Sequence, residues 1–379
     1  MDAEATLGAI IRAKGAELHQ QHPLNAPQLK VMRSLADCRT PALGGHRDTC
    51  DRCGYEHIFW NSCRDRHCPG CGSEARERWL DARRDEILDV PYFHAVFTIP
   101  QELHVLALIA PVLVYAILLR AAGQAVLDVA ETKLRARFGV LAVLHTWGQL
   151  LAFHPHVHCV IPGGGFSLDG RRWVRVRKVS FLFAIKVLSR RFRTLVCNAL
   201  RQAFKDGSLC LPASIAADAT ELDVLLARAC KTDWHAYVKP PFGGANHVLA
   251  YLAAYTHRIA ISNHRILAFD GQNVTFSWRD YADHNQRKEM TLPAVEFLRR
   301  FSMHIVPPRF TRVRYYGFFA NRMRAANLEK ARALIGASAR SQRPQREPHI
   351  PLCPRCKQGV MQRGLDIDPQ LPRIWFDSS

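Results

Sequence analysis

The 379-residue chain is 48% hydrophobic and 22% charged, so it can build two or more cores, and wholesale disorder is excluded. Its 52 lysines and arginines outnumber 33 aspartates and glutamates, which gives a net charge of +19. Such an imbalance usually serves to neutralise a polyanion, and nucleic acid is therefore the first partner to expect.

The first 35 residues are expected to form a helical lead-in. Apolar side chains recur at helical spacing around Leu7, Ile10 and Leu18, and Pro23 and Pro27 interrupt the pattern. This stretch contains no apolar export segment, so the twelve cysteines of the chain fit metal binding or free thiols better than disulfides. We accordingly expect a cytoplasmic location.

Residues 36–90 are predicted to form a zinc-binding module that contacts DNA. Six of the twelve cysteines fall in this segment, which has too few aliphatic residues to build a core. Two CxxC pairs separated by fourteen residues can each supply two corners of a tetrahedral site. Because four thiolates leave no open position for catalysis, the predicted ion is a structural Zn²⁺. Its predicted ligands are Cys50, Cys53, Cys68 and Cys71.

Other residues of this module leave the ligand set open. His46, Cys63 and His67 are near enough in sequence to replace one ligand or to form a second site. Arg64 and Arg66 flank the proposed metal turns and are predicted DNA contacts. The charged stretch 73–90 has the spacing of a solvated helix, whose basic face can also touch phosphate.

Residues 91–335 have the pattern of a mixed α+β domain. A strand is expected over 92–100 and an apolar helix over 103–135. The longest apolar run, Val105 to Leu119, is shorter than the ~20 residues of a bilayer-spanning helix and contains Pro111. We interpret it as a buried helix and expect no membrane partner. Further strands are expected over 143–149, 154–162 and 173–181, helices over 185–204 and 247–255, and a hairpin over 266–280.

The strand over 154–162 (HPHVHCVIP) carries three histidines in register. Strand alternation places His154, His156 and His158 on one face and apolar residues on the other. Imidazoles spaced by two residues on a strand can bind one divalent ion together, so the pattern predicts a metal site. The preceding strand offers Gln149 or His145 as a further ligand across the turn, and Gln149 is preferred.

The predicted helix over 247–255 carries two tyrosines four residues apart. Tyr251 and Tyr255 lie on one helical face, and Arg258 follows on the same stripe. Tyrosines at this spacing most often pack against a core, but a neighbouring histidine metal strand in a basic chain favours catalysis. A phenol can attack a phosphodiester when a metal polarises the phosphate oxygens and cations stabilise the developing charge.

The last part of the chain offers weaker signals. Arg312 and Arg314 precede four aromatic residues and are predicted to form a surface on which unpaired bases stack, although core packing explains the aromatics equally well. Residues 336–379 are expected to be a loosely ordered tail, apart from its CxxC pair. Its CxxC pair, Cys353 and Cys356, is half a zinc site that could recruit His349 or a partner chain.

The motifs and their order along the chain resemble those of the HUH-endonuclease superfamily. Within it, they resemble those of the two-tyrosine insertion-sequence transposases with an N-terminal zinc-binding domain. The matching stretches cover 38–322 and include NSCRDRHCPGCG, HTWGQ, HPHVHCVIPGGG, YLAAYTHRIAISNHR and RYYGFFANR. The resemblance implies that His156 and His158 form the metal-binding motif, to which His154 is additional. It also implies that Tyr251 and Tyr255 are the nucleophiles and that Arg258 replaces a motif lysine.

The resemblance implies an α+β fold, with an HUH-endonuclease-like central antiparallel sheet flanked by helices and a small N-terminal zinc module. The implied enzyme is a transposase that uses Mg²⁺ or Mn²⁺ to cleave and transfer single-stranded DNA through a 5′-phosphotyrosine, as in rolling-circle transposition. Its partners would be single-stranded or hairpin element ends and target DNA. The implied location is the prokaryotic cytoplasm, in association with the nucleoid.

Two other functions stay open at this point. A plasmid replication initiator or relaxase would use the same chemistry, and the DNA that is cut would distinguish it from a transposase. A non-catalytic zinc-containing DNA-binding protein would use the histidines structurally, and replacing its tyrosines would change no activity. The oligomeric state is not predicted.

Overall fold

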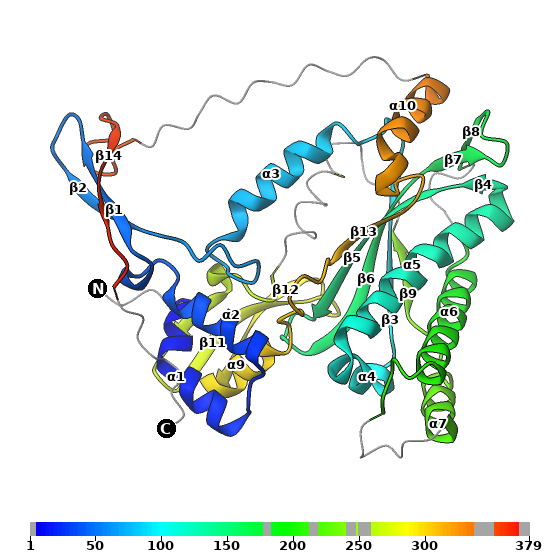
Figure 1. Ribbon diagram of the computed structural model, residues 1–379, viewed down its shortest axis with the longest axis horizontal. Coiled ribbons are helices and arrows are strands. Elements are labelled where there is room, and N and C mark those ends of the chain that lie inside the picture. Colours follow the sequence, from blue (N-terminus) through cyan, green and yellow to red (C-terminus); the bar gives the residue numbers. More distant parts are fainter. Residues whose placement is uncertain are drawn as a thin grey trace.

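A five-stranded antiparallel sheet lies at the centre of the molecule (Figure 1). The computed structural model describes residues 5–176, 183–211, 219–239, 248, 259–336 and 352–370. The strand order is β13-β5-β6-β3-β9, and all neighbouring pairs are antiparallel. The predicted α+β fold class with a central antiparallel sheet is confirmed. The strands are β3 (Tyr92–Thr98), β5 (Gly139–Trp147), β6 (Phe153–Pro162), β9 (Ala236–Lys239) and β13 (Val313–Gly317).

Two adjacent inner strands, β5 and β6, form the hairpin that their sequence predicts. All nine residues of β5 are buried, which explains its nearly continuous apolar sequence. The chain then turns back tightly: the Gly148 N–H donates to the Ala152 carbonyl at 3.1 Å, and Leu151 has a φ of 57°. This turn sets a register in which His145 lies opposite His156.

Helices cover one face of the central sheet (Figure 1). The predicted apolar helix over 103–135 is two helices, because Pro111 ends one and occupies the first position of the next. The second is long and apolar enough to cross a membrane, but it packs against the sheet, with Ala122 and Val126 fully buried in the apolar core. The helices on this face are α4 (His104–Ile109), α5 (Pro111–Leu134), α6 (Ile185–Lys205) and α7 (Ala219–Ala229).

The N-terminal helices pack on a distant hairpin. Leu7 and Ile10 share an apolar cluster with Phe276 and Phe297, although more than 250 residues separate the two segments. A capping box between Asn25 and Gln28 starts the second helix. The helices are α1 (Leu7–Gln21) and α2 (Ala26–Asp37), and they meet β10 (Ile266–Phe269), β11 (Asn273–Asp280), β12 (Gln286–Pro293) and α9 (Ala294–Ser302).

A separate three-stranded sheet joins segments from the N-terminal and C-terminal parts of the chain. β14 (Met361–Ile367) pairs antiparallel with β1 (Gly45–Cys50), which also pairs with β2 (Glu56–Trp60). This corrects the expectation of a loosely ordered tail for residues 352–370, which form part of the N-terminal module. Polar composition suggested disorder, whereas backbone pairing with a distant strand supplies the order. The tail and the zinc-binding module, predicted as separate segments, are therefore joined through β14 and β1.

The remaining elements lie at one end of the central sheet. They are α3 (Gly72–Arg84), β4 (Ala136–Arg137), β7 (Gly164–Ser167), β8 (Trp173–Arg175) and α10 (Arg324–Ile335). The strand predicted over 173–181 is described only as far as residue 176, and β8 forms three of its residues. The helix predicted over 247–255 lies outside the described residues apart from Val248.

Candidate functional site

Three histidines converge on the face of the sheet opposite helices α4 to α7. His145 of β5 pairs with His156 of β6, and His158 lies two residues further along β6. One ring nitrogen from each side chain lies within 4.8 Å of the others. Val157 and Cys159, which alternate with these histidines, are fully buried in the core beneath α5. The strand alternation expected for His156 and His158 is therefore observed, and their backing is apolar.

His145 fits the third position of this cluster better than Gln149. β5 ends at Trp147, and the turn that follows stops the strand alternation before residue 149. The Gln149 side chain is engaged elsewhere: its Nε2 donates to the Tyr281 hydroxyl at 2.9 Å, and its Oε1 accepts from the Arg279 N–H at 3.4 Å. Gln149 stays a prediction, and His145 becomes the candidate that the geometry favours.

His94 of β3 extends the cluster and was missed by the sequence analysis. Its Nε2 lies 2.9 Å from Nδ1 of His158, and its ring stacks on that of His158. Burial, followed by the charges of Lys239 and His156, lowers the pKa of His94 to about 3, so its ring is neutral at physiological pH. A bond at Nδ1 leaves Nε2 of His158 to coordinate a metal and holds the ring in one orientation. Strand alternation in YFHAVFT was the available signal.

A cavity of about 1010 Å³ opens in front of the histidines. Lys239 and Arg265 give its wall positive charge, and Asp280, the acidic residue among its described lining residues, is paired with Lys288 at 2.9 Å. Trp278 near the end of β11 and Tyr281 just after it also line the cavity. A cavity with nitrogen ligands on one wall and cations on another is suited to a phosphate group.

Tyr251, Tyr255 and Arg258 lie outside the described residues. Their predicted roles as nucleophiles and supporting cation remain predictions.

The predicted zinc ligands are divided between two cysteine clusters. Cys68 and Cys71 lie with Cys38 and Cys63, and the sulfur atoms of Cys38 and Cys71 are 3.4 Å apart. Cys50 belongs to the other cluster, as does its neighbour Cys53. The prediction of one shared site is corrected, because the β1–β2 hairpin carries the first CxxC turn at its tip and leaves the second at its base.

The other ligand candidates of the module have different contacts. His67 Nδ1 lies 2.8 Å from Asp65 Oδ1, and its Nε2 accepts from the Val306 N–H at 3.2 Å. His46 Nε2 lies 3.4 Å from Asp48 Oδ1. Cys63 is the residue of this group that joins a cysteine cluster. The chemistry of the first cluster, four sulfur atoms from Cys38, Cys63, Cys68 and Cys71, fits structural zinc.

The four arginines predicted to contact DNA differ in their surroundings. Arg66 donates to the Phe310 carbonyl at 2.5 Å and to the Pro307 carbonyl at 2.7 Å, so it holds the loop before β13. Burial, and then the nearby charge of Arg66, lowers the pKa of Arg312 to about 10. Arg64 is exposed at the surface of the module. These environments suit structural roles for Arg66 and Arg312 better than phosphate contacts.

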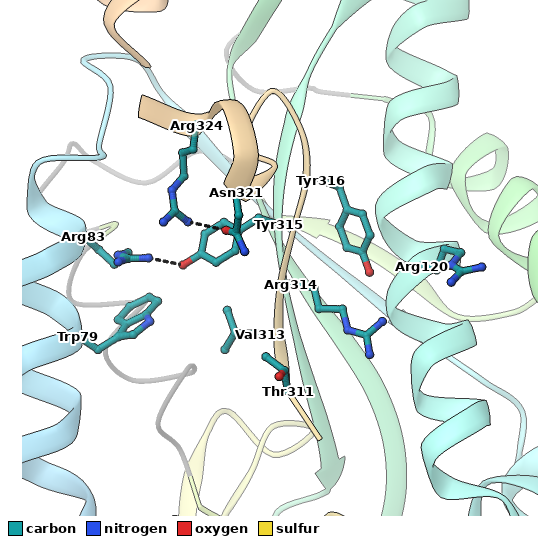
Figure 2. A pocket seen from close by; sticks show the side chains of 10 residues that line it. All are labelled: Trp79, Arg83, Arg120, Thr311, Val313, Arg314, Tyr315, Tyr316, Asn321 and Arg324. Atoms are coloured by element: carbon teal, nitrogen blue, oxygen red, sulfur yellow. Dashed lines mark hydrogen bonds between the residues drawn. The ribbon is translucent and has the colours of Figure 1, made fainter. Parts of the chain in front are cut away.

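Arg314 lines a second cavity, of about 610 Å³, which Figure 2 shows between α3, α5 and β13. Arg83 of α3 donates to the Tyr315 hydroxyl at 3.0 Å, and the Arg324 guanidinium carbon lies 4.5 Å from the centre of the Tyr315 ring. The remaining lining residues include Trp79, Arg120 and Tyr316. Of the four aromatics predicted to stack bases, Tyr315 and Tyr316 line this cavity, whereas Phe318 and Phe319 are buried in the core.

Comparisons with known proteins match two parts of the chain to two transposase families. Residues 10–99 match the family described as "Transposase zinc-binding domain", and residues 139–327 match the family described as "Putative transposase". The chain is 43% identical to "Putative transposase y4qJ" of Sinorhizobium fredii, over 97% of this chain and 98% of that protein. It is 29% identical to "Transposase for insertion sequence element IS801" of Pseudomonas savastanoi pv. phaseolicola, over 83% and 76% of the respective chains. No solved structure matches the chain.

Proposed function

This chain belongs to the transposase family with an N-terminal zinc-binding domain, and from that premise we propose that it cleaves and rejoins single-stranded DNA through a 5′-phosphotyrosine. Transposases bind DNA, and the net charge of +19 fits such a partner. The observation that carries the proposal is the cluster of His145, His156 and His158 at the wall of a cationic cavity.

The three histidines would hold the catalytic divalent ion, which when bound polarises a phosphate oxygen and stabilises the charge of the transition state. An imidazole ligand set suits Mn²⁺ better than Mg²⁺, because Mg²⁺ prefers oxygen ligands. Within the chain, His94 would orient His158 through the hydrogen bond at Nδ1. Lys239 and Arg265 would attract the phosphate backbone to the cavity.

The proposed nucleophile is the phenolic oxygen of Tyr251 or Tyr255. It would lose its proton and attack the phosphorus atom, and the bond from phosphorus to the 3′-oxygen would break. The products would be a free 3′-hydroxyl and a 5′-phosphotyrosine. The phosphotyrosine bond would conserve the energy of the broken phosphodiester, so rejoining would need no ATP. Attack by another 3′-hydroxyl would reverse the step and transfer the strand. Two tyrosines would allow one chain to hold two 5′ ends in succession, and Arg258 would stabilise developing charge.

The cavity of Figure 2 supports a path for unpaired DNA on the same molecule. Its arginines can pair with phosphates, and Trp79, Tyr315 and Tyr316 offer rings on which bases can stack. The proposed partners are therefore single-stranded or hairpin element ends and target DNA. We also propose that the protein is located in the cytoplasm, in association with the nucleoid.

The covalent intermediate provides the test. Labelled single-stranded DNA carrying an element end is incubated with the full chain and Mn²⁺ or Mg²⁺, and a denaturing gel is examined for a protein–DNA adduct. The adduct is expected to disappear in the Tyr251→Phe/Tyr255→Phe variant. Tyr55→Phe, which removes a phenolic hydroxyl in the zinc module, is the matched control and should retain it. An adduct that persists in the double variant would refute the proposed nucleophiles.

A further inference from the structure

Two CxxC turns from opposite ends of the chain meet beside the β1–β14 pair. Cys50 is the last residue of β1 and Cys53 follows it, whereas Cys353 and Cys356 precede β14. Their four sulfur atoms lie within 4.8 Å of one another. The distance is 3.8 Å between the sulfur atoms of Cys50 and Cys356 and 3.7 Å between those of Cys53 and Cys353. A tetrahedral zinc site with bonds of ~2.3 Å has sulfur atoms about 3.8 Å apart, so the spacing matches zinc.

The two turns have the same backbone construction. The residue after the second cysteine has a left-handed conformation in both, with a φ of 67° at Gly54 and 59° at Lys357. Its N–H donates to the carbonyl of the first cysteine, at 3.1 Å for Cys50 and 2.9 Å for Cys353. This geometry directs both sulfur atoms of a turn to one point, as a metal site made of two turns requires.

Backbone N–H groups also point at the sulfur atoms. The Arg52 N–H donates to Cys50 Sγ at 3.4 Å, and the Gly359 N–H donates to Cys356 Sγ at 3.3 Å. Hydrogen bonds to sulfur stabilise its negatively charged form, which is the form that binds metal. The turns are therefore built for thiolates.

The two turns are also fitted closely to each other. The Asp51 N–H donates to the Val360 carbonyl at 3.1 Å, and the Val360 N–H donates to Asp51 Oδ1 at 2.9 Å. A Cβ atom at Gly359 would collide with Cys50 Sγ and lie 2.7 Å from Asp51 Oδ1. Only glycine permits the tail to approach the first turn this closely.

Apolar packing and disulfides explain the cluster less well than a metal. The buried residues of this apolar cluster are Cys50, Cys353 and Met361, which is little hydrophobic area for ordering a chain end. The sulfur distances of 3.7 and 3.8 Å are far from the ~2.05 Å of a disulfide bond. Four thiolates around zinc supply the missing stability.

We propose that Cys50, Cys53, Cys353 and Cys356 bind a second structural zinc ion, which fastens the C-terminal segment to the N-terminal module. The segment that matches the zinc-binding family, residues 10–99, contains all four cysteines of the first cluster but only half of this one. The zinc-binding module of this protein is thus discontinuous in sequence. This site is independent of the histidine cluster and of the proposed tyrosine chemistry.

Zinc content of the purified full chain, measured by mass spectrometry of the metal against protein concentration, tests the site. Two zinc ions per chain are expected. Cys353→Ser/Cys356→Ser should retain one, as should Cys63→Ser/Cys68→Ser. Cys210→Ser/Cys230→Ser is the matched control with two cysteines outside both clusters, and it should retain two. Equal zinc content in wild type and the Cys353→Ser/Cys356→Ser variant would overturn the proposal.

A second measurement separates zinc loss from misfolding. The Cys353→Ser/Cys356→Ser variant should show new protease cleavage within 352–370 and an unchanged circular dichroism spectrum, because the core of the central sheet contains none of these residues. Gly359→Ala, which keeps every ligand, should release one zinc ion to a competing chelator sooner than wild type does. A wild-type mass that reveals disulfides between these cysteines under non-reducing conditions would also overturn the proposal.

Discussion

The histidine cluster and the cysteine clusters are both candidate metal sites, but different forces hold them. β5 and β6 present His145, His156 and His158 from a sheet whose opposite face carries an extensive apolar core with α5 and α6. The sheet of β1, β2 and β14 has no comparable support among the described residues, and every residue of β2 except Trp60 is exposed. The histidine site is preorganised by hydrophobic burial, whereas the site of Cys50, Cys53, Cys353 and Cys356 has a small apolar cluster and is proposed to depend on its metal.

This contrast has a chemical counterpart. The histidine cluster borders a cavity and offers three side chains, so an ion held there would keep coordination positions for a substrate. Each cysteine cluster uses four sulfur atoms and leaves none. A site that must exchange ligands during a reaction benefits from a scaffold that stays folded without the ion. A site that serves only to hold chain segments together can rely on the ion for its stability.

Removal of zinc should produce the largest effect and the clearest separation of the two regions. Structural zinc contributes on the order of 10 kcal/mol to folding, so a strong chelator should unfold the module around Cys38 and Cys68. The core that includes Val157 and Phe97 should stay intact. Limited proteolysis with mass mapping should find new cleavages in residues 38–72 and none in β5 or β6. Equal resistance of the zinc module to protease with and without chelator would show that its fold does not depend on the metal.

The next effect concerns the third histidine. His145→Ala removes a candidate ligand and should lower the yield of covalent adduct at least about 100-fold, since even outer partners of metal ligands are worth ~10- to 100-fold. Gln149→Ala is the matched comparison and should cost less than about tenfold, because Gln149 contacts Tyr281 and Arg279. DNA binding should be unchanged in both. The opposite ranking would return Gln149 to the ligand set.

The smallest expected effect tests how rigidly the sheet positions its ligands. His94→Leu deletes the partner of His158 Nδ1 and should weaken Mn²⁺ binding about tenfold, as measured by titration followed by electron paramagnetic resonance. His94→Gln can still offer a hydrogen bond and should recover part of this loss. A fall in thermal stability with unchanged Mn²⁺ affinity would assign His94 to packing alone.

The β5–β6 hairpin of the central sheet could be predicted because its contacts are local in sequence. The alternation of His156 and Val157 along one strand, and the short turn after Trp147, specify a hairpin with its own register. The hairpin around Asp270 and Gly271 follows for the same reason: the Asp270 carboxylate accepts from the N–H groups of Gln272 and Asn273, and Gly271 has a φ of 91°.

Local periodicity also explains where prediction of the site failed. It extended the strand past Trp147 to Gln149, although the turn changes the direction of the chain there. It could not select His94, because the hydrogen bond to His158 depends on which strand becomes the neighbour of β6. Strand order in a sheet is set by the packing of the whole domain, which no single segment encodes.

The sequence alone determined the chemistry of this protein: a basic chain, paired thiols in a segment without a core, and histidines in register on a strand. These features follow from residue type and from spacings of a few residues, which the backbone converts directly into geometry. The tertiary structure alone decided how the cysteines divide into two clusters and that Cys353 and Cys356 meet Cys50 and Cys53. Such pairings join residues 300 positions apart. Their partners are chosen by the packing of strands that are distant in sequence, so spacing along the chain contains no record of them.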